Sequence, residues 1–424
     1  MLVAHDTVRY SGGTGDHAVR NPHGWGPGFI RENAVRQLLT ICLCLFATAL
    51  LAHDGMSMHM RKASALGASA AFDSHGTLWV VDALDNHIRV RQSTDNGVTL
   101  GAPVIVNPQA EPIYTSGENR PKIAFGPHDE IYVSWSQPRE KPWTGFVRFA
   151  RSLDHGAHFS PPLTVHRDRA EITHSFDALA VDGSGRIVTA WIDKRDEQAA
   201  TAQGKPYLGA AVYYNWSTDG GATFVPERKL VDQSCECCRI VLTRTADGAV
   251  AAFFREIYGD NFRDHAYAVL RTDGQASKVE RATFNQWQIA ACPRHGPGLA
   301  IGNDGTRHAV WFEASDEPTI WYGQLAPGHA PRHQLAIATA GASHADVAVH
   351  GHTVWVVWNQ VGSAGYALML RRSSDGGRHF GVPTEIARSN PAAGSPQLLV
   401  KGAQAFVAWN TAAGFRLVPT ASKS

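Results

Sequence analysis

A short apolar segment that ends in a polar residue recurs seven times along the chain. The copies end at Val81-Asp82, Trp135-Ser136, Trp191-Ile192-Asp193, Phe254-Arg255-Glu256, Trp311-Phe312-Glu313, Trp358-Asn359 and Trp409-Asn410. About ten residues earlier lies a shorter apolar run such as 122–125, and an Asp-Gly turn often separates the two, as at Asp182-Gly183. Short runs rich in aromatic and β-branched residues between Gly and Asp turns are typical of strands. The pattern predicts an all-β chain of repeated antiparallel units.

A second repeat, S-x-D-x-G-x-x-[FL], occurs four times. Its copies begin at Ser93, Ser152, Ser217 and Ser373, so the last interval, 156 residues, equals three intervals of 52. In such a segment the Asp accepts turn amide hydrogens, the Gly takes a positive φ, and the apolar residue folds back onto the sheet. Repeats of this length are typical of propellers and other arrays.

This second repeat resembles the Asp box of the sialidase-like superfamily of β-propellers, over residues 64–424. The resemblance implies a propeller of four-stranded antiparallel blades, with Asp boxes on the rim and a pocket at the central channel. Six four-stranded units and a C-terminal trio of strands at 397–400, 405–409 and 415–419 favour seven blades. A strand near 59–66 would complete the seventh blade, and six blades, as in the family's sialidases, is the alternative.

One long apolar stretch, residues 38–52, follows Arg31 and Arg36. It is short for a membrane span and ends in small residues, which is typical of a signal-peptide core. We therefore expect residues 1–52 to be an N-terminal extension and signal peptide, 53–63 a flexible leader rich in Met and His, and 64–424 one propeller domain. The protein should be exported to the periplasm or secreted, as a monomer whose mature chain has no transmembrane segment.

The charge balance limits the partners. Lys and Arg number 39 against 38 Asp and Glu, and no block of basic residues occurs. Such a chain lacks the phosphate-neutralising surface that drives binding to DNA or RNA, so a nucleic-acid partner is not expected. At 44% hydrophobic residues the chain can bury a large core.

Chemistry is expected at one mouth of the central channel. Residues that enter each innermost strand and residues that follow the second strand should converge there. The resemblance implies Arg120, Arg239 and Arg255 as clamps for a substrate carboxylate, His295 as a binding residue, Tyr258 as nucleophile with Glu256 as its base, and Asp177 or Asp193 as acid. The family's F/Y-R-I-P motif is absent, and residues 118–122 echo it only in part. The alternative is that these residues form structural ion pairs.

Cysteine gives the most distinctive local signal. Cys235, Cys237, Cys238 and Cys292 remain once the signal peptide, with its Cys42 and Cys44, is removed. Cys292 enters the innermost strand of the blade after the one that the C-x-C-C segment enters, so the four should be neighbours. An oxidising compartment favours a disulfide from Cys292 to one of the other three. The alternative is a copper or zinc site completed by His295 or His265.

Two classes of function follow. The first is a sialidase-like glycoside hydrolase or glycan-binding protein for acidic sugars or a small acidic ligand. The second is a non-enzymatic periplasmic propeller, either with a Cys/His copper- or redox-linked site or as a protein-interaction scaffold. Alternating Met and His in the leader, which copper(I) prefers, also favours the second class.

Overall fold

The computed structural model describes residues 66–421, and nearly all of their regular structure is β. The first two sheets each contain four antiparallel strands in chain order. They consist of β1 (Ser69–Phe72), β2 (Leu78–Leu84), β3 (His87–Ser93) and β4 (Val104–Ile105), then β5 (Lys122–Phe125), β6 (Ile131–Pro138), β7 (Gly145–Ser152) and β8 (Leu163–Thr164).

The next two four-stranded units share one sheet, because β12 and β14 pair at Ser234 and Glu256. The strands are β9 (His174–Val181), β10 (Ile187–Asp193), β11 (Ala210–Ser217) and β12 (Arg228–Ser234), then β13 (Val241–Arg244), β14 (Val250–Tyr258), β15 (Phe262–Val269) and β16 (Val279–Arg281). Within each unit the pairing is antiparallel and sequential, as in the other sheets.

Two further four-stranded sheets and one three-stranded sheet complete the described residues. They contain β17 (Gly298–Ile301), β18 (Arg307–Glu313), β19 (Thr319–Ala326) and β20 (His329–Ala338), then β21 (Ala342–His350), β22 (Thr353–Gly362), β23 (Gly365–Ser373) and β24 (Thr384–Ser389), and last β25 (Gln397–Lys401), β26 (Gln404–Thr411) and β27 (Gly414–Pro419). The predicted all-β architecture of four-stranded antiparallel units is confirmed.

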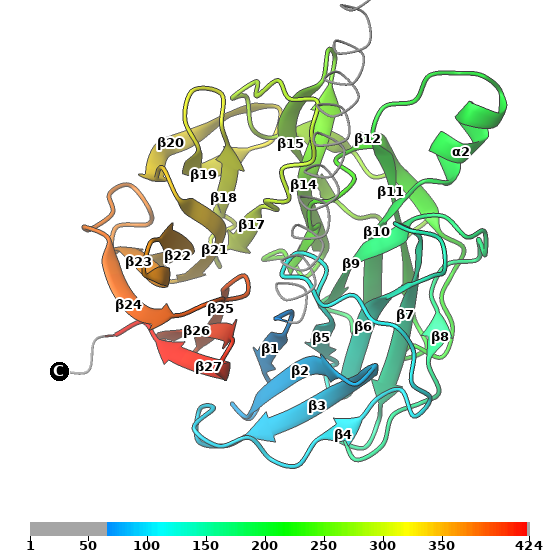
Figure 1. Ribbon diagram of the computed structural model, residues 1–424, viewed down its shortest axis with the longest axis horizontal. Helices are drawn as coiled ribbons and strands as arrows, with labels where there is room; N and C mark the ends of the chain where they lie inside the picture. The colour runs from blue at the N-terminus through cyan, green and yellow to red at the C-terminus, as the bar shows by residue number, and fades with distance from the viewer. Residues whose placement is uncertain (1–65, 422–424) are drawn as a thin grey trace, which may run out of the picture. The chain divides into compact units, whose positions relative to one another are not determined.

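The first strands of successive units contact one another in the order β1, β5, β9, β13, β17, β21, β25, and β25 also contacts β1 (Figure 1). A hydrogen bond of 3.0 Å from the Ala70 amide to Gln397 Oε1 joins β1 to β25. Leu78 and Val80 of the first sheet pack with Leu399 and Ala408 of the last. The C-terminal sheet thus meets the first sheet.

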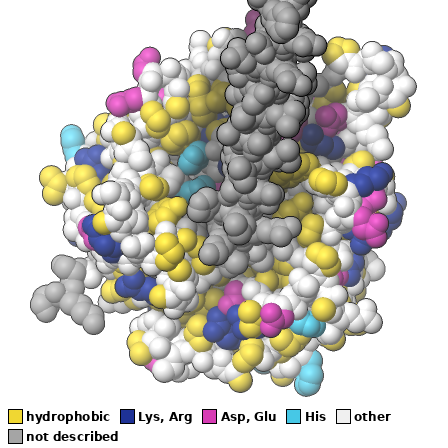
Figure 2. All heavy atoms as spheres, in the orientation of Figure 1, with side chains coloured by type: hydrophobic (Ala, Val, Ile, Leu, Met, Phe, Trp, Pro, Cys, Tyr) yellow, Lys and Arg dark blue, Asp and Glu magenta, His cyan; other side chains and the backbone are white. Residues whose placement is uncertain are grey.

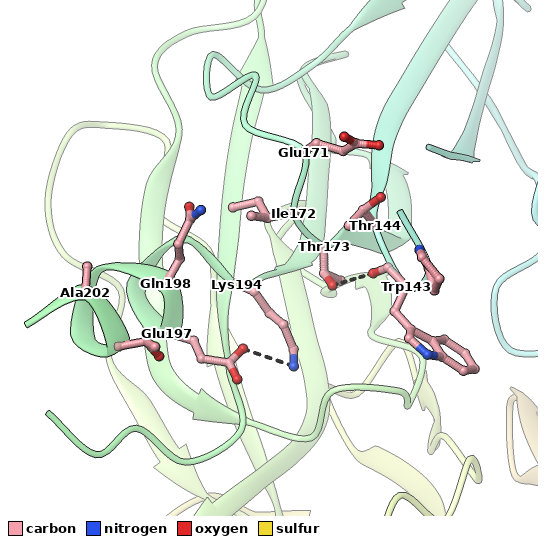
Figure 3. Close-up of a pocket in the computed structure, with 11 residues that line it drawn as sticks. Trp143, Thr144, Glu171, Ile172, Thr173, Lys194, Glu197, Gln198 and Ala202 are labelled. Carbon is pink, nitrogen blue, oxygen red and sulfur yellow. Dashed lines mark hydrogen bonds and ion pairs between the residues drawn. The ribbon is translucent and has the colours of Figure 1, made fainter. Parts of the chain in front are cut away.

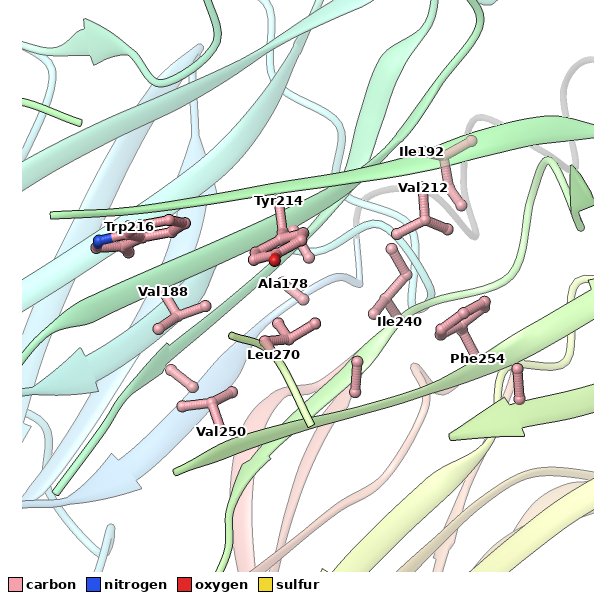
Figure 4. Packing of buried hydrophobic residues seen from close by; sticks show 14 of the residues in the cluster. Ala178, Val188, Ile192, Val212, Tyr214, Trp216, Ile240, Val250, Phe254 and Leu270 are labelled. Carbon is pink, nitrogen blue, oxygen red and sulfur yellow. The ribbon is translucent and has the colours of Figure 1, made fainter. Parts of the chain in front are cut away.

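Apolar side chains fill the layers between neighbouring sheets. The largest such cluster joins the third and fourth units, where Val212 and Tyr214 meet Phe254 and Leu270 (Figure 4). The aromatic residues that close the second strands are buried, among them Trp191. Because each second strand is covered on both faces by neighbouring sheets, its sequence is a continuous apolar run rather than an alternating one.

The four turns of the second repeat are closed by the same hydrogen bonds. In each, the Ser hydroxyl donates to the Asp carboxylate at 2.7 Å. The Gly amide then donates to the Ser hydroxyl at 2.8 to 2.9 Å. In the third unit Ser217 pairs with Ile187, at the end of the sheet opposite to Asp193. The turns therefore lie away from the second-strand ends where chemistry is expected.

The helix α2 (Arg195–Ala202) lies between β10 and β11 and was not predicted. Asp196 and Glu197 occupy its first turn, where negative charge favours a helix, and alanines supply helix propensity. The proposed signal peptide, the leader, Cys42, Cys44 and nearly all of the expected strand near 59–66 fall outside the described residues. Among residues 66–421 no helix has the length and apolar character needed to cross a membrane.

Candidate functional site

A buried carboxylate, Glu118, lies at a junction of four first strands, because it precedes β5 and contacts residues that precede or begin β13, β17 and β21. Its Oε1 accepts hydrogen bonds from Arg239 Nη1 and His344 Nδ1, each at 2.9 Å. Its Oε2 accepts the Gly296 amide at 2.8 Å and the Arg239 amide at 3.3 Å. Burial alone would raise the pKa of this carboxyl, but the Arg239 and His344 contacts hold it well below its usual range. Glu118 is therefore a buried anion.

The guanidinium groups of Arg120 and Arg239 lie at this junction and bind the protein itself. Arg239 Nε donates to the Pro297 carbonyl at 2.9 Å and Nη2 to the Ala345 carbonyl at 2.7 Å, so all three of its side-chain nitrogens are engaged. Arg120 Nη1 donates to the Ser395 carbonyl at 2.8 Å. Both side chains are buried. Arg239 thus forms a structural ion pair with Glu118, and Arg120 joins the connection before β5 to the connection before β25.

The structure places Asp177 and Asp193 in separate, fully formed networks. Asp177 accepts the hydroxyls of Ser134 and Ser136, at 2.6 and 2.8 Å. Asp193 accepts His174 Nδ1, Trp191 Nε1 and Arg195 Nη2, at 2.9, 2.8 and 2.7 Å. Although burial opposes it, these donors hold the pKa of Asp193 below its ordinary range. Such a carboxylate is a poor proton donor at neutral pH.

Glu256 and Tyr258, both on β14, form a hydrogen-bonded pair of ionisable side chains that is partly exposed to solvent. The Tyr258 hydroxyl donates to Glu256 Oε2 at 2.9 Å, and both side chains are half-buried. Burial raises the pKa of Glu256 to about 7, because the Tyr258 hydroxyl alone only partly offsets the lost hydration. Burial and the neighbouring Glu256 charge raise the pKa of Tyr258. The guanidinium of Arg281 lies 4.6 Å from the centre of the Tyr258 ring.

Arg255 precedes Glu256 on β14, so its side chain points to the opposite face of that strand, where it contacts His295. Arg255 Nη2 donates to the carbonyls of His295 and Phe312, at 3.0 and 2.8 Å. Its Nε and Nη1 are buried and have no hydrogen-bond partner among residues 66–421. The His295 ring stacks on Phe312 and His344, with centroid distances of 4.1 and 4.8 Å. Burial and the nearby His344 lower the pKa of His295 to about 3, so the ring is neutral at physiological pH.

The four predicted cysteines gather in one cysteine cluster, made of Cys235, Cys237, Cys238 and Cys292. A disulfide joins Cys237 to Cys292, as expected from the sequence. Cys235 and Cys238 are free and buried, with 3.3 Å between their sulfur atoms. The sulfur atoms of Cys235, Cys237 and Cys292 all lie within 4.8 Å of one another. With one bridge formed, the cluster offers the two free sulfurs to a soft metal such as copper or zinc.

A cleft of about 520 Å³ opens between α2 and the connection from β6 to β7 (Figure 3). Trp143 lies on one side with 66% of its surface exposed and a φ of 65°, and Lys194 and Glu197 lie on the other. Lys194 Nζ pairs with Glu197 at 3.0 Å and with Glu236 at 3.1 Å. The guanidinium of Arg294 lies 5.5 Å from the Trp143 ring centre. Glu236 and Arg294 thus connect the cleft to the cysteine segments.

The sequence placed Glu118 in a segment that enters a first strand but assigned it no role, and it did not predict the cleft. Glu118 belongs to the segment 118–122 that partly echoes a family motif, and that position was the available signal. Trp143 had none, because one aromatic residue in a polar loop resembles many others. On the face drawn in Figure 2, positive and negative side chains lie next to each other in small groups, in keeping with the balanced charge.

Comparison with known proteins gives a fold but no family. No known family profile matches the sequence, and no curated protein matches it. The polysaccharide lyase Uly1 matches in structure with a TM-score of 0.51 and 9% identity, over 84% of this chain and 89% of that one. A Dyadobacter fermentans protein of unknown function matches in structure with a TM-score of 0.50 and 11% identity, over 73% of this chain and 96% of that one. The Hadza microbial sialidase Hz136 matches with a TM-score of 0.46 and 11% identity, over 77% of this chain and 71% of that one.

At such identities the likeness concerns the fold alone, and function has to be argued from the site. The two structures with TM-scores of 0.50 and 0.51 share the fold of this chain and assign it no activity.

Proposed function

We propose that this protein is an exported, seven-bladed propeller that acts on an acidic glycan, with Tyr258 and Glu256 as its catalytic pair. The contacts between β25 and β1 support a closed ring of seven units, the last with three described strands. The disulfide supports export, because such bonds persist in oxidising compartments. The fold is one that carbohydrate-active proteins use, and that likeness is an analogy only.

The observation that carries the proposal is the 2.9 Å hydrogen bond from Tyr258 to a Glu256 carboxyl whose pKa is raised to about 7. A group with this pKa can both accept and return a proton at neutral pH. Glu256 would remove the phenolic proton as the Tyr258 oxygen attacks the anomeric carbon, and the electron pair of the glycosidic bond would leave with the sugar oxygen, which takes a proton from a water molecule. The resulting hydroxide would then displace Tyr258 from the anomeric carbon, and the Tyr258 oxygen would take its proton back from Glu256. Arg281, over the Tyr258 ring, would stabilise the phenolate that develops.

The cleft is the proposed binding site for the glycan chain. An exposed indole such as Trp143 offers an apolar face to a sugar ring, and Arg294, whose guanidinium lies 5.5 Å from the centre of the Trp143 ring, adds positive charge for an acidic group. Lys194 binds Glu236, and the preceding residue, Cys235, donates its amide to the Arg255 carbonyl. One series of contacts thus links the cleft to the strand that bears the catalytic pair.

Turnover of acidic glycosides and uronate-containing polysaccharides tests the proposal. We expect Tyr258→Phe and Glu256→Gln each to lower kcat by about 100-fold, in line with the loss of a proton-transfer group or nucleophile. Tyr207→Phe is the matched control, because that hydroxyl binds the Asp232 carbonyl outside the pair and its loss should leave kcat unchanged. Trp143→Ala should raise KM with little change in kcat. Folded protein that turns over none of these substrates would favour the non-enzymatic reading.

A further inference from the structure

The cysteine cluster contains one disulfide and two free thiols. The Cys237 to Cys292 disulfide lies at the surface, because the Cys292 side chain is exposed, whereas Cys235 and Cys238 are buried thiols. The Cys235 sulfur lies within 4.8 Å of both disulfide sulfurs and 3.3 Å from the Cys238 sulfur. It therefore stands between the surface disulfide and a second thiol.

We propose that the cysteine cluster is a thiol–disulfide exchange site, in which the disulfide moves between Cys237–Cys292 and Cys235–Cys238. The site would serve an external dithiol or disulfide that reaches the exposed sulfur of Cys292. Cys235 is the residue that links the two bonds, since it is within reach of both.

The exchange balances without an added oxidant. The Cys235 thiolate attacks the Cys237 sulfur, so a bond between Cys235 and Cys237 forms, the bond to Cys292 breaks, and Cys292 leaves as a thiolate. The Cys238 thiolate then attacks the Cys235 sulfur, and Cys237 leaves as the second thiolate. The two protons lost by Cys235 and Cys238 end on Cys237 and Cys292. One dithiol has been oxidised and one disulfide reduced.

The surroundings favour a thiolate at Cys235. Arg255 lies on the adjoining strand β14, and its carbonyl accepts the Cys235 amide at 3.0 Å. The hydrogen bond with the Cys238 thiol, with 3.3 Å between the sulfur atoms, lowers the pKa of Cys235 against the effect of burial, and the Arg255 guanidinium lowers it further. Two buried nitrogens of that guanidinium have no hydrogen-bond partner among the described residues. A cation beside a thiol favours the thiolate, which is the species that attacks a disulfide. The positive charge of the Arg255 guanidinium can therefore stabilise the Cys235 thiolate that attacks the disulfide.

Limited redox titration of the full-length protein tests this exchange. One sample is fully oxidised and treated with one equivalent of a phosphine reductant, and the other is fully reduced and treated with one equivalent of diamide. Each is left without further reagent, alkylated with N-ethylmaleimide and mapped by mass spectrometry under non-reducing conditions. Peptide mapping separates the cluster from Cys42 and Cys44.

We expect both samples to contain the Cys235–Cys238 bridge together with maleimide on Cys237 and Cys292. Two results would overturn the proposal. In one, both samples contain only the Cys237–Cys292 bridge, with maleimide on Cys235 and Cys238. In the other, the bridge found depends on the route by which the sample was prepared.

Two variants separate the steps. Cys235→Ser should slow maleimide labelling of Cys292 by at least about tenfold, because the linking thiol is gone. Cys238→Ser should stop after the first step and accumulate a Cys235–Cys237 bridge with a free Cys292. Circular dichroism checks the fold of each variant, and the wild-type titration remains decisive if a variant misfolds.

Discussion

Replacing Glu118 by Gln should destabilise the fold more than any other single charge removal discussed above. The carboxylate receives donors on both oxygens: Arg239 and His344 at Oε1, and the amides of Gly296 and Arg239 at Oε2. A Gln side chain keeps one acceptor oxygen, so its amide group must face donors on the other side. The Arg239 guanidinium also loses its counter-charge while it stays buried.

The expected loss in the free energy of unfolding at pH 7 is about 3 to 5 kcal/mol, the cost of removing one partner from a buried ion pair. Urea unfolding followed by tryptophan fluorescence measures it, and an unchanged m-value would show that the unfolded surface is comparable. Glu385→Gln is the matched control. Its pair with Arg388, at 3.0 Å, is largely exposed, so its removal should cost less than about 1 kcal/mol.

The effect should also depend on pH. The Glu118 pKa is depressed in the folded state, so its contribution is complete above the unfolded value of about 4.5. It is lost as the pH falls through the folded value, so the gap between wild type and Glu118→Gln should narrow in acid. A double-mutant cycle with Arg239→Met tests the pairing. The losses in unfolding free energy of the two single variants should sum to more than the loss measured for the double variant. A loss under about 1 kcal/mol at pH 7, or strict additivity, would refute this account of the junction.

Two further predictions concern stability. Because burial raises the folded-state pKa of Glu256 to about 7, the wild type should lose stability as the pH rises from about 4.5 to 7, and Glu256→Gln should remove that loss. Urea unfolding at pH 5 and pH 8 checks it, and an equal pH dependence in both proteins would contradict it. Asp219→Ala should cost about 1 kcal/mol, since it removes acceptors for Ser217 and Thr223. Asp219→Asn should cost less because it keeps one acceptor, and equal losses would count against this view of the turn.

The strands were predictable because their signals are local. A second strand such as β10 is an apolar run bounded by turn residues, and the Ser217 turn closes on hydrogen bonds within five residues. The helix α2 was missed for the complementary reason. None of its residues is buried, so it leaves no apolar stripe in the sequence for a helical period to reveal.

The meeting point of the first-strand connections was also predictable, but the partners within it were not. Repeat symmetry says that residues entering neighbouring first strands occupy equivalent positions, and so it brings Arg120, Arg239 and His295 toward one region. It does not say which of them ion-pair. Glu118 and Arg239 are 121 residues apart, and Glu118 and His344 are 226 apart. Such pairs form only if long side chains from different units extend to one another, and the repeat pattern does not determine which side chains do so.

Asp193 and Glu256 show why the sequence could not rank the acidic candidates. Both follow the apolar run of a second strand, so the repeat treats them as equivalent. Asp193 receives hydrogen bonds from His174, Trp191 and Arg195, which stabilise its charge and lower its pKa. Glu256 receives one, from Tyr258, and burial raises its pKa to about 7. The number of donors around each carboxylate sets its protonation. Of these two carboxyls, Glu256 is therefore the one suited to exchange a proton at neutral pH.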